Sequence, residues 1–210
     1  MRFADVDAVT VDGFGTLLQL RNPVPALAAA LRARGVDRDE AAVTRAFREE
    51  ARYYRAHAQT AGDHIRLQTL RRDCTAVFLA ALEADLDVEE FTPAFLAALV
   101  FELVPGAVQT IAALAGRGLE LAVVANWEIS LRDHLRTHGL EHRFATIVIS
   151  AEVGAAKPAA RPFQLALAEL GIGAERALHV GDDRVDKEGA AAAGMRFAQA
   201  PLCRAFAGWQ

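Results

Sequence analysis

The stretch that most constrains the fold spans residues 8–18, where a short β-branched run ends in a carboxylate, two glycines and a hydroxyl. The run predicts a buried strand whose carboxyl end delivers Asp12 into a tight turn. Gly13 and Gly15 allow unusual backbone dihedral angles and let N–H groups approach a ligand closely. An Asp-Gly hairpin turn would share this local sequence, but helical periodicity follows instead of a second strand. The stretch therefore favours a functional strand end over a hairpin.

A long helical segment follows this strand. Between residues 19 and 101, apolar side chains recur at helical spacing with no strand pattern among them. Asp37 is the expected N-cap of the second helix, and Pro93 is expected in the first turn of the last one. The expected helices cover residues 23–34, 37–58, 63–84 and 92–101. We therefore expect an all-α insertion over 19–101.

From residue 105 onward, short apolar runs alternate with helical patterns. Strands are expected at 119–125, 145–149, 177–181 and 195–199, with helices at 107–115, 130–138, 160–170 and 188–193. Such alternation is typical of βαβ units joined by right-handed crossovers. The expected fold class is α/β, a Rossmann-like parallel sheet with helices on both faces.

Polar clusters follow the successive strands of this sheet. Asp12 and Thr16 follow the first strand, and Asn126 follows the second. Because the carboxyl ends of parallel strands meet at one edge, these side chains should converge with Lys157 and with the acids after the fourth strand. Those acids are Asp182, Asp183 and Asp186. His179 is expected to pack as an ordinary strand residue, and Trp127 to line the pocket.

The composition excludes several classes of protein. Hydrophobic residues make up 53% of the chain and charged residues 24%, and the net charge of −4 argues against a nucleic-acid-binding surface. Cys74 and Cys203 fit neither a metal site nor a disulfide framework, which is typical of a reducing cytoplasm. The sequence contains neither a membrane-spanning apolar run nor a secretory signal pattern. We expect a cytoplasmic monomer or homodimer that binds no nucleic acid and no membrane.

The order of the motifs resembles the haloacid dehalogenase superfamily. Its first motif matches Asp12-x-x-Gly15-Thr16-Leu17, its third matches Lys157-Pro158, and its fourth matches Gly181-Asp182-x-x-x-Asp186. The resemblance implies an α/β core of residues 1–18 and 102–210, with 19–101 where the family inserts a helical cap domain. It covers the core from end to end.

The resemblance also implies a chemistry. Asp12 would be the nucleophile toward a small phosphorylated substrate, and Lys157 would pair with it and with the phosphoryl oxygens. Mg²⁺ would be held by Asp12, the carbonyl of Phe14 and Asp182, with Asp186 or Asp183 in the first or second coordination sphere. Thr16 would donate a hydrogen bond to the bound group. Asn126 and the backbone N–H groups of Gly13 and Gly15 would bind the substrate.

Two positions depart from the family's phosphatases. Phe14 stands where they carry an aspartate that serves as general acid and base, and Ala125 stands where they supply a hydroxyl. An aromatic residue at the position of Phe14 is similar to the superfamily's dehalogenases, which need no metal. Three hypotheses therefore remain: a Mg²⁺-dependent phosphohydrolase restricted to good leaving groups, a 2-haloacid dehalogenase-like enzyme acting on a halogenated substrate, and a catalytically degenerate protein that binds a phosphorylated ligand.

Overall fold

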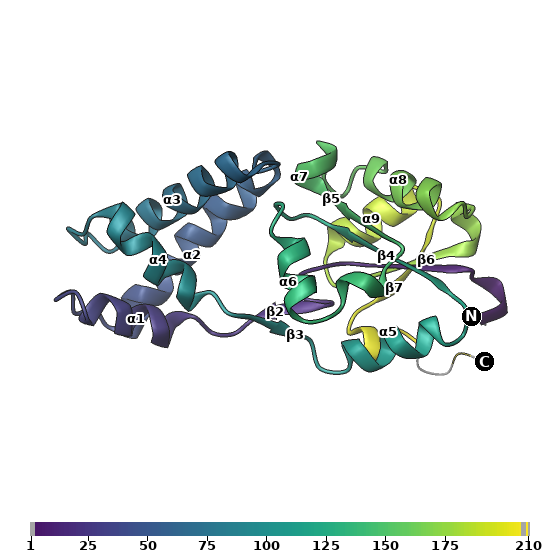
Figure 1. The fold of residues 1–210 in the computed structure, drawn as a ribbon, viewed down its shortest axis with the longest axis horizontal. Helices are drawn as coiled ribbons and strands as arrows, with labels where there is room; N and C mark the ends of the chain where they lie inside the picture. Colours follow the sequence, from purple (N-terminus) through teal and green to yellow (C-terminus); the bar gives the residue numbers. More distant parts are fainter. Residues whose placement is uncertain (1–2, 207–208, 210) are drawn as a thin grey trace. The chain divides into compact units, whose positions relative to one another are not determined.

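The computed structural model describes residues 3–206 and 209, and it divides the chain into two compact units (Figure 1). One unit combines Met1–Gln19 with Leu103–Gln210, and the other is Leu20–Glu102. The chain thus begins in the first unit, runs through the second and returns.

The first unit is built on a five-stranded sheet in the order β5-β4-β1-β6-β7. All four neighbouring pairs are parallel, with Val11 of the central strand opposite Val123 on one side and Val180 on the other. The strands are β1 (Ala8–Val11), β4 (Glu120–Ala125), β5 (Thr146–Ile149), β6 (Ala177–Gly181) and β7 (Arg196–Gln199). This topology confirms the expected α/β class and places the carboxyl ends of β1, β4 and β6 side by side.

Helices cover this sheet, with α8 and α9 on one face and α5 on the other (Figure 1). Phe163 and Ala166 of α8 and Ala190 of α9 pack into one core cluster with strand residues such as Val124. The helices of this unit are α5 (Ala107–Ala115), α6 (Leu131–Thr137), α7 (Ser150–Val153), α8 (Arg161–Leu170), α9 (Arg184–Ala192) and α10 (Leu202–Ala205). Three 3₁₀ turns complete it: η1 (Phe3–Asp5), η3 (Glu141–Arg143) and η4 (Ala174–Arg176).

Helix α9 begins four residues earlier than the alanine-rich pattern at 188–193 predicted. A capping box fixes its start, because Asp183 is the N-cap and the Asp186 side chain accepts a hydrogen bond from the Asp183 backbone N–H at 3.1 Å. The expected helix was therefore too short. Of the acids that follow β6, Asp183 is the N-cap of α9 and Asp186 lies in its first turn.

The second unit contains α1 (Val24–Arg32), α2 (Glu40–His57), η2 (Ala58–Thr60), α3 (His64–Ala81) and α4 (Val88–Ala98). The ring of Phe78 in α3 packs against those of Phe91 and Phe95 in α4, with centroid distances of 6.3 and 5.2 Å, and all three rings are fully buried. Two short strands, β2 (Leu18–Leu20) and β3 (Phe101–Leu103), pair with each other where the chain leaves and re-enters the first unit. The expectation of a purely α segment over 19–101 is therefore wrong at its two ends.

Two expected helix starts are also wrong in this unit. The N-cap of α2 is Asp39 and not Asp37, since the Asp39 carboxylate accepts the N–H of Ala42 at 2.6 Å. Helix α4 begins at Val88 behind the cap Asp87, so that Pro93 lies inside the helix and not in its first turn. In both cases the side-chain cap defines the start better than the apolar period or the proline does.

None of the helices in the described part of the chain combines the length and the apolar character that crossing a bilayer requires.

Glu50 of α2 is a buried carboxyl group in this helical unit, with 4% of its surface exposed. Burial raises its pKa from the ordinary 4.5 to about 7, although a hydrogen bond with Cys74 and the charge of Arg55 oppose the shift. Because the folded state holds the proton more tightly than the unfolded state, the stability that this proton confers is complete below pH 4.5 and is lost as the pH rises through 7.

We predict that Glu50→Gln removes this pH dependence. At pH 8.5 the variant should be more stable than the wild type by about 3 kcal/mol, while near pH 4.5 the two should be equally stable. Urea denaturation followed by circular dichroism at both pH values measures the difference. Glu49→Gln changes an exposed neighbour and serves as the matched control. Parallel pH profiles for the wild type and Glu50→Gln would contradict the prediction.

Candidate active site

The centre of the candidate site is a buried lysine held between two buried carboxylates. Lys157 Nζ donates to Asp12 Oδ1, to Asp186 Oδ1 at 2.6 Å and to the Val124 carbonyl of β4 at 2.9 Å. These three acceptors use all the hydrogens of the ammonium group. Asp12, Lys157 and Asp186 are 7%, 5% and 1% exposed, so the cluster is shielded from bulk water.

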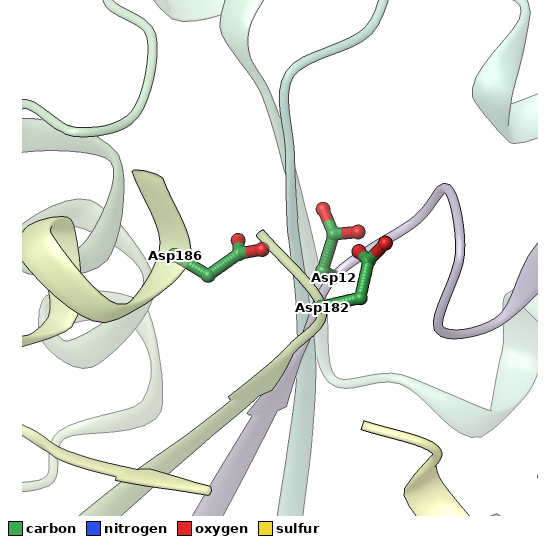
Figure 2. A group of neighbouring side chains, drawn as sticks. All are labelled: Asp12, Asp182 and Asp186. Atoms are coloured by element: carbon green, nitrogen blue, oxygen red, sulfur yellow. The ribbon is translucent and has the colours of Figure 1, made fainter. Parts of the chain in front are cut away.

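The residues of this cluster and their neighbour Asp182 lie in the segments that follow three strands, β1, β5 and β6. Asp12 directly follows β1, and its N–H donates to the Val180 carbonyl of β6 at 2.9 Å, which continues the sheet to the residue itself. Asp182 directly follows β6, and Asp186 lies in the first turn of α9 (Figure 2). The parallel sheet thus brings together Asp12, Lys157, Asp182 and Asp186.

Burial and charge act on these groups in opposite directions. Burial raises the pKa of Asp12 to about 7; the Lys157 ammonium opposes this shift and the Asp186 carboxylate adds to it. Burial alone would also raise the pKa of Asp186, but the hydrogen bond from His179 and the charge of Lys157 bring it below its ordinary value. Burial would lower the pKa of Lys157, yet the two carboxylates raise it. Lys157 is therefore a permanent cation that holds two acids together.

Asn126 positions the backbone of Lys157. Its side-chain oxygen accepts the Lys157 N–H at 2.7 Å, and its side-chain nitrogen donates to the Lys157 carbonyl at 2.9 Å. The Lys157–Pro158 peptide bond is cis. We expected Asn126 to bind the substrate, whereas in the structure both ends of its amide hold the loop that carries the lysine.

Gly15 is required by the close approach of a carboxylate. Its φ of +82° is unfavourable for other residues, and a Cβ atom there would overlap the carboxylate of Asp182. Its N–H donates to the Leu18 carbonyl at 2.7 Å, so in this structure it serves the turn and not a substrate. At Gly13, a Cβ atom would lie 3.2 Å from both Ala125 and Trp127. Both glycines therefore let the first loop pack tightly against its neighbours.

Thr16 contributes a hydroxyl group without a partner. The side chain is fully buried, and among the described residues its Oγ1 is the one buried side-chain polar atom that lacks a hydrogen bond. Leaving such a group unsatisfied costs about 1–3 kcal/mol. A bound group that accepts this hydrogen bond would remove the cost.

Three carboxylates lie close enough to share a cation. The ligand oxygens of Asp12, Asp182 and Asp186 all lie within 4.8 Å of one another (Figure 2). Burial raises the pKa of Asp182, and the neighbouring Asp186 adds to the shift, while the charge of Lys157 opposes it. Asp183 is different, since it caps α9 and accepts the Arg184 N–H at 2.5 Å. Asp183 and Asp186 were both candidates for the remaining position in the metal's coordination spheres, and Asp186 is the one that lies beside the site.

The side chain of Phe14 is 51% exposed although it follows a buried strand. Its ring centroid lies 6.2 Å from that of Trp127, which is itself buried and was expected to line the pocket. A phenyl group can neither donate a proton to a leaving group nor accept one from a water molecule. The position next to Asp12 and Gly13 thus provides an apolar surface without a titratable group.

Sequence reasoning missed one polar residue beside the site. His179 is fully buried in β6, with Nε2 3.1 Å from Asp186 Oδ1 and Nδ1 2.8 Å from Thr10 Oγ1. Burial lowers the pKa of His179 to about 4, although the hydrogen bond to Asp186 acts to raise it. We expected ordinary packing. The register of β1 and β6 would have revealed the pair, because Thr10 lies opposite His179 and two residues before Asp12 on the same strand face.

Comparison with known proteins gives this arrangement a family context. The sequence profile of haloacid dehalogenase-like hydrolases matches residues 6–194. The mouse protein named haloacid dehalogenase-like hydrolase domain-containing protein 3 is 33% identical over 200 residues, which cover 89% of this chain and 78% of that protein. The match therefore extends through both structural units.

Two further matches are with phosphatases. The phosphoserine phosphatase of Thermus thermophilus is 41% identical over 98 residues, or 46% of this chain and 39% of that enzyme. The crystal structure of a HAD phosphatase from Thermococcus onnurineus superimposes with a TM-score of 0.60 at 25% identity, covering 91% of this chain and 85% of that one.

Proposed function

The chain belongs to the haloacid dehalogenase-like hydrolases, and we propose that it is a Mg²⁺-dependent phosphohydrolase that attacks small phosphorylated metabolites through Asp12. The similarity to phosphatases supports a phosphatase-like hydrolase. The observation that supports a reaction through Asp12 is the placement of Lys157 between Asp12 and Asp186, with Asp182 beside them. Such a cluster can hold a carboxylate nucleophile next to a cationic partner for a phosphoryl group.

The oxygen donors of the site fit Mg²⁺. The ion prefers oxygen ligands and retains several waters, and the carboxylates of Asp12 and Asp182 with the Phe14 carbonyl would supply such a set. Asp186 lies within reach of the same ion, but its oxygens already accept hydrogen bonds from Lys157, His179 and the Asp183 N–H. We therefore place Asp186 in the second coordination sphere of the metal, where it does not contact the ion directly. When bound, the metal neutralises charge on the phosphoryl oxygens.

The chain's own residues perform the transfer. An oxygen of Asp12 attacks phosphorus and forms a carboxyl–phosphate bond, while the bond to the leaving oxygen breaks and that oxygen departs with the electron pair. Lys157 offsets the charge of both reacting groups, and Thr16 donates its unpartnered hydroxyl to a phosphoryl oxygen. A water oxygen then attacks the same phosphorus and the bond to Asp12 breaks, so that the Asp12 carboxylate is restored and inorganic phosphate leaves with one proton of the water while the other passes to solvent.

Phe14 restricts the substrates that can react. General acid catalysis contributes about 10²–10⁴-fold, and Phe14 cannot provide it to a departing alkoxide. Phenolates and carboxylates leave without a proton, so aryl and acyl phosphates should react faster than alkyl phosphates. The exposed apolar ring of Phe14 beside Trp127 also suits an aryl leaving group.

We predict that Phe14→Asp increases kcat on alkyl phosphates by about tenfold or more, because it introduces a proton donor for the leaving oxygen. The same variant should change kcat/KM on aryl phosphates much less, because kcat/KM reports the step in which the leaving group departs and not the later hydrolysis of the aspartyl phosphate. Steady-state release of inorganic phosphate measures both. Phe14→Asn has a similar polar side chain without a titratable proton and serves as the matched control. Equal rates on the two substrate classes in the wild type would remove the basis of the prediction.

A substrate screen with and without Mg²⁺ separates the three functions. A phosphohydrolase releases phosphate and stops in EDTA. A 2-haloacid dehalogenase-like enzyme, which the aromatic residue at position 14 favours, would release halide from 2-haloacids and continue in EDTA. A protein that only binds a phosphorylated ligand would show no Asp12-dependent turnover of either kind.

We further propose that unit Leu20–Glu102 acts as the cap domain that selects substrates. We also propose that the enzyme works in the cytoplasm on free metabolites, as its composition indicates.

A further inference from the structure

A pair of buried polar residues lies on β1 and β6, two residues before the reacting carboxylate along β1. Thr10 of β1 and His179 of β6 are direct neighbours in the parallel register, and both side chains are fully buried. Side chains at residues 10 and 12 of one strand point to the same face. The pair therefore lies on the face of the sheet that carries Asp12.

The hydrogen bonds of His179 define its tautomer. An ionised Asp186 carboxylate can only accept, so His179 Nε2, 3.1 Å away, must carry the proton. In the neutral ring, Nδ1 is then an acceptor, and the Thr10 hydroxyl donates to it at 2.8 Å. The chain of donors runs in one direction, from Thr10 through His179 to Asp186.

This series of hydrogen bonds ends at Asp186, the carboxylate that binds the lysine. Asp186 Oδ1 accepts from His179 and from Lys157 Nζ, while Oδ2 accepts the Asp183 N–H at 3.1 Å. With three donors around it, the Asp186 carboxylate has one orientation. Lys157 Nζ is bound on one side by that carboxylate and on the other by Asp12. The orientation of Asp186 therefore decides where the ammonium group lies.

We propose that His179 is a positioning residue, which fixes the carboxylate of Asp186 and thereby holds Lys157 against Asp12. Thr10 supports it by fixing the tautomer. The role rests on the proposed function for its effect on turnover, but the effect on Lys157 is a property of the protein alone. Phe163, whose ring meets His179 edge-on at 4.9 Å, packs against the same imidazole without a hydrogen bond. A substitution at Phe163 therefore separates the effect of packing around His179 from the effect of its hydrogen bonds.

Three variants test the proposal. His179→Leu removes both hydrogen bonds, His179→Gln keeps a donor for Asp186 and an acceptor for Thr10, and Phe163→Leu alters only the packing. We expect His179→Leu to lower kcat about tenfold or more with little change in KM, since a displaced lysine impairs the transfer step more than it impairs substrate binding. His179→Gln should restore kcat to within a few-fold of the wild type, and Phe163→Leu should lower the thermal midpoint alone.

The ammonium resonance of Lys157 provides a readout that needs no activity. The chain has two lysines, and Lys187 is exposed, so in a ¹⁵N-labelled sample a slowly exchanging Nζ signal belongs to Lys157. This signal should shift or broaden in His179→Leu, and it should persist in His179→Gln and Phe163→Leu. The imidazole ¹⁵N spectrum of the wild type should show His179 protonated at Nε2.

Failure of this proposal differs from failure of the proposed function. An unchanged Lys157 signal in His179→Leu, a wild-type imidazole protonated at Nδ1, or equal kcat losses in His179→Leu and Phe163→Leu would each overturn the positioning role. Absence of Asp12-dependent turnover in the wild type would overturn the proposed function and leave the Lys157 and imidazole signals to decide the positioning role.

Discussion

Replacing Asp12 with asparagine is expected to lower phosphate release about 10³-fold or more, because the amide oxygen is a poor nucleophile and no carboxyl–phosphate bond can form. The fold should remain intact. Asparagine has nearly the same shape, and burial already favours the neutral form of this carboxyl group by raising its pKa to about 7. Lys157 also keeps its ion pair with Asp186. Initial rates and urea midpoints of the two proteins, measured side by side, check both expectations.

Two results would contradict this expectation. Turnover by Asp12→Asn within a few-fold of the wild type would show that another group attacks the substrate. A large fall in the urea midpoint would show that the lost rate reflects unfolding and not chemistry. Asp183→Asn is the matched control, because Asp183 caps α9 outside the cluster and carries no role in the transfer.

Replacing Lys157 with methionine should produce the largest loss of stability in the protein. Methionine fills a similar volume, but the buried carboxyl groups of Asp12 and Asp186 would then face each other without the ammonium group that neutralises them. Removing one member of a buried ion pair costs about 3–5 kcal/mol. Activity should fall as well, since the charge that neutralises the phosphoryl group is absent.

A double-mutant cycle isolates the origin of that loss. Combined with Asp12→Asn, Lys157→Met should cost clearly less than it does alone, because one of the two unpaired carboxylates has been neutralised. Lys187→Met removes an exposed lysine and should change the free energy of unfolding by less than about 0.5 kcal/mol. If Lys157→Met and Lys187→Met have similar effects, the buried cluster does not carry the stability assigned to it.

The sheet and its edge could be predicted from the sequence because their signals are local. The run before Asp12 and the near-continuous apolar run of β4 mark strands buried on both faces, and alternation with helices implies parallel pairing. The convergence of Asp12, Lys157 and Asp182 follows from that topology alone. Helix starts were less predictable: at Asp39 and Asp87 the cap side chain decides where the helix begins, and neither apolar spacing nor the proline shows which candidate acid is the cap.

The finer roles in the site depend on contacts that a sequence does not show. Whether Asn126 faces a substrate or the backbone of Lys157 depends on a loop 31 residues away. His179 has the pattern of a core strand residue, and its link to Asp186 requires the start of α9 at Arg184, which the alanine-rich pattern placed too late. The unpartnered hydroxyl of Thr16 likewise becomes visible only once the packing around it is known.

The role of Asp12 as the nucleophile is tested most directly by looking for a phosphoryl group on its side chain. Because Phe14 cannot act as general base for water, the aspartyl phosphate should break down slowly and accumulate with an aryl phosphate and Mg²⁺. After acid quenching, mass spectrometry should find one added phosphoryl group on the tryptic peptide that contains Asp12, and none in Asp12→Asn. Steady phosphate release by the wild type with that peptide never modified, or with the modification on another residue, would show that Asp12 is not the nucleophile.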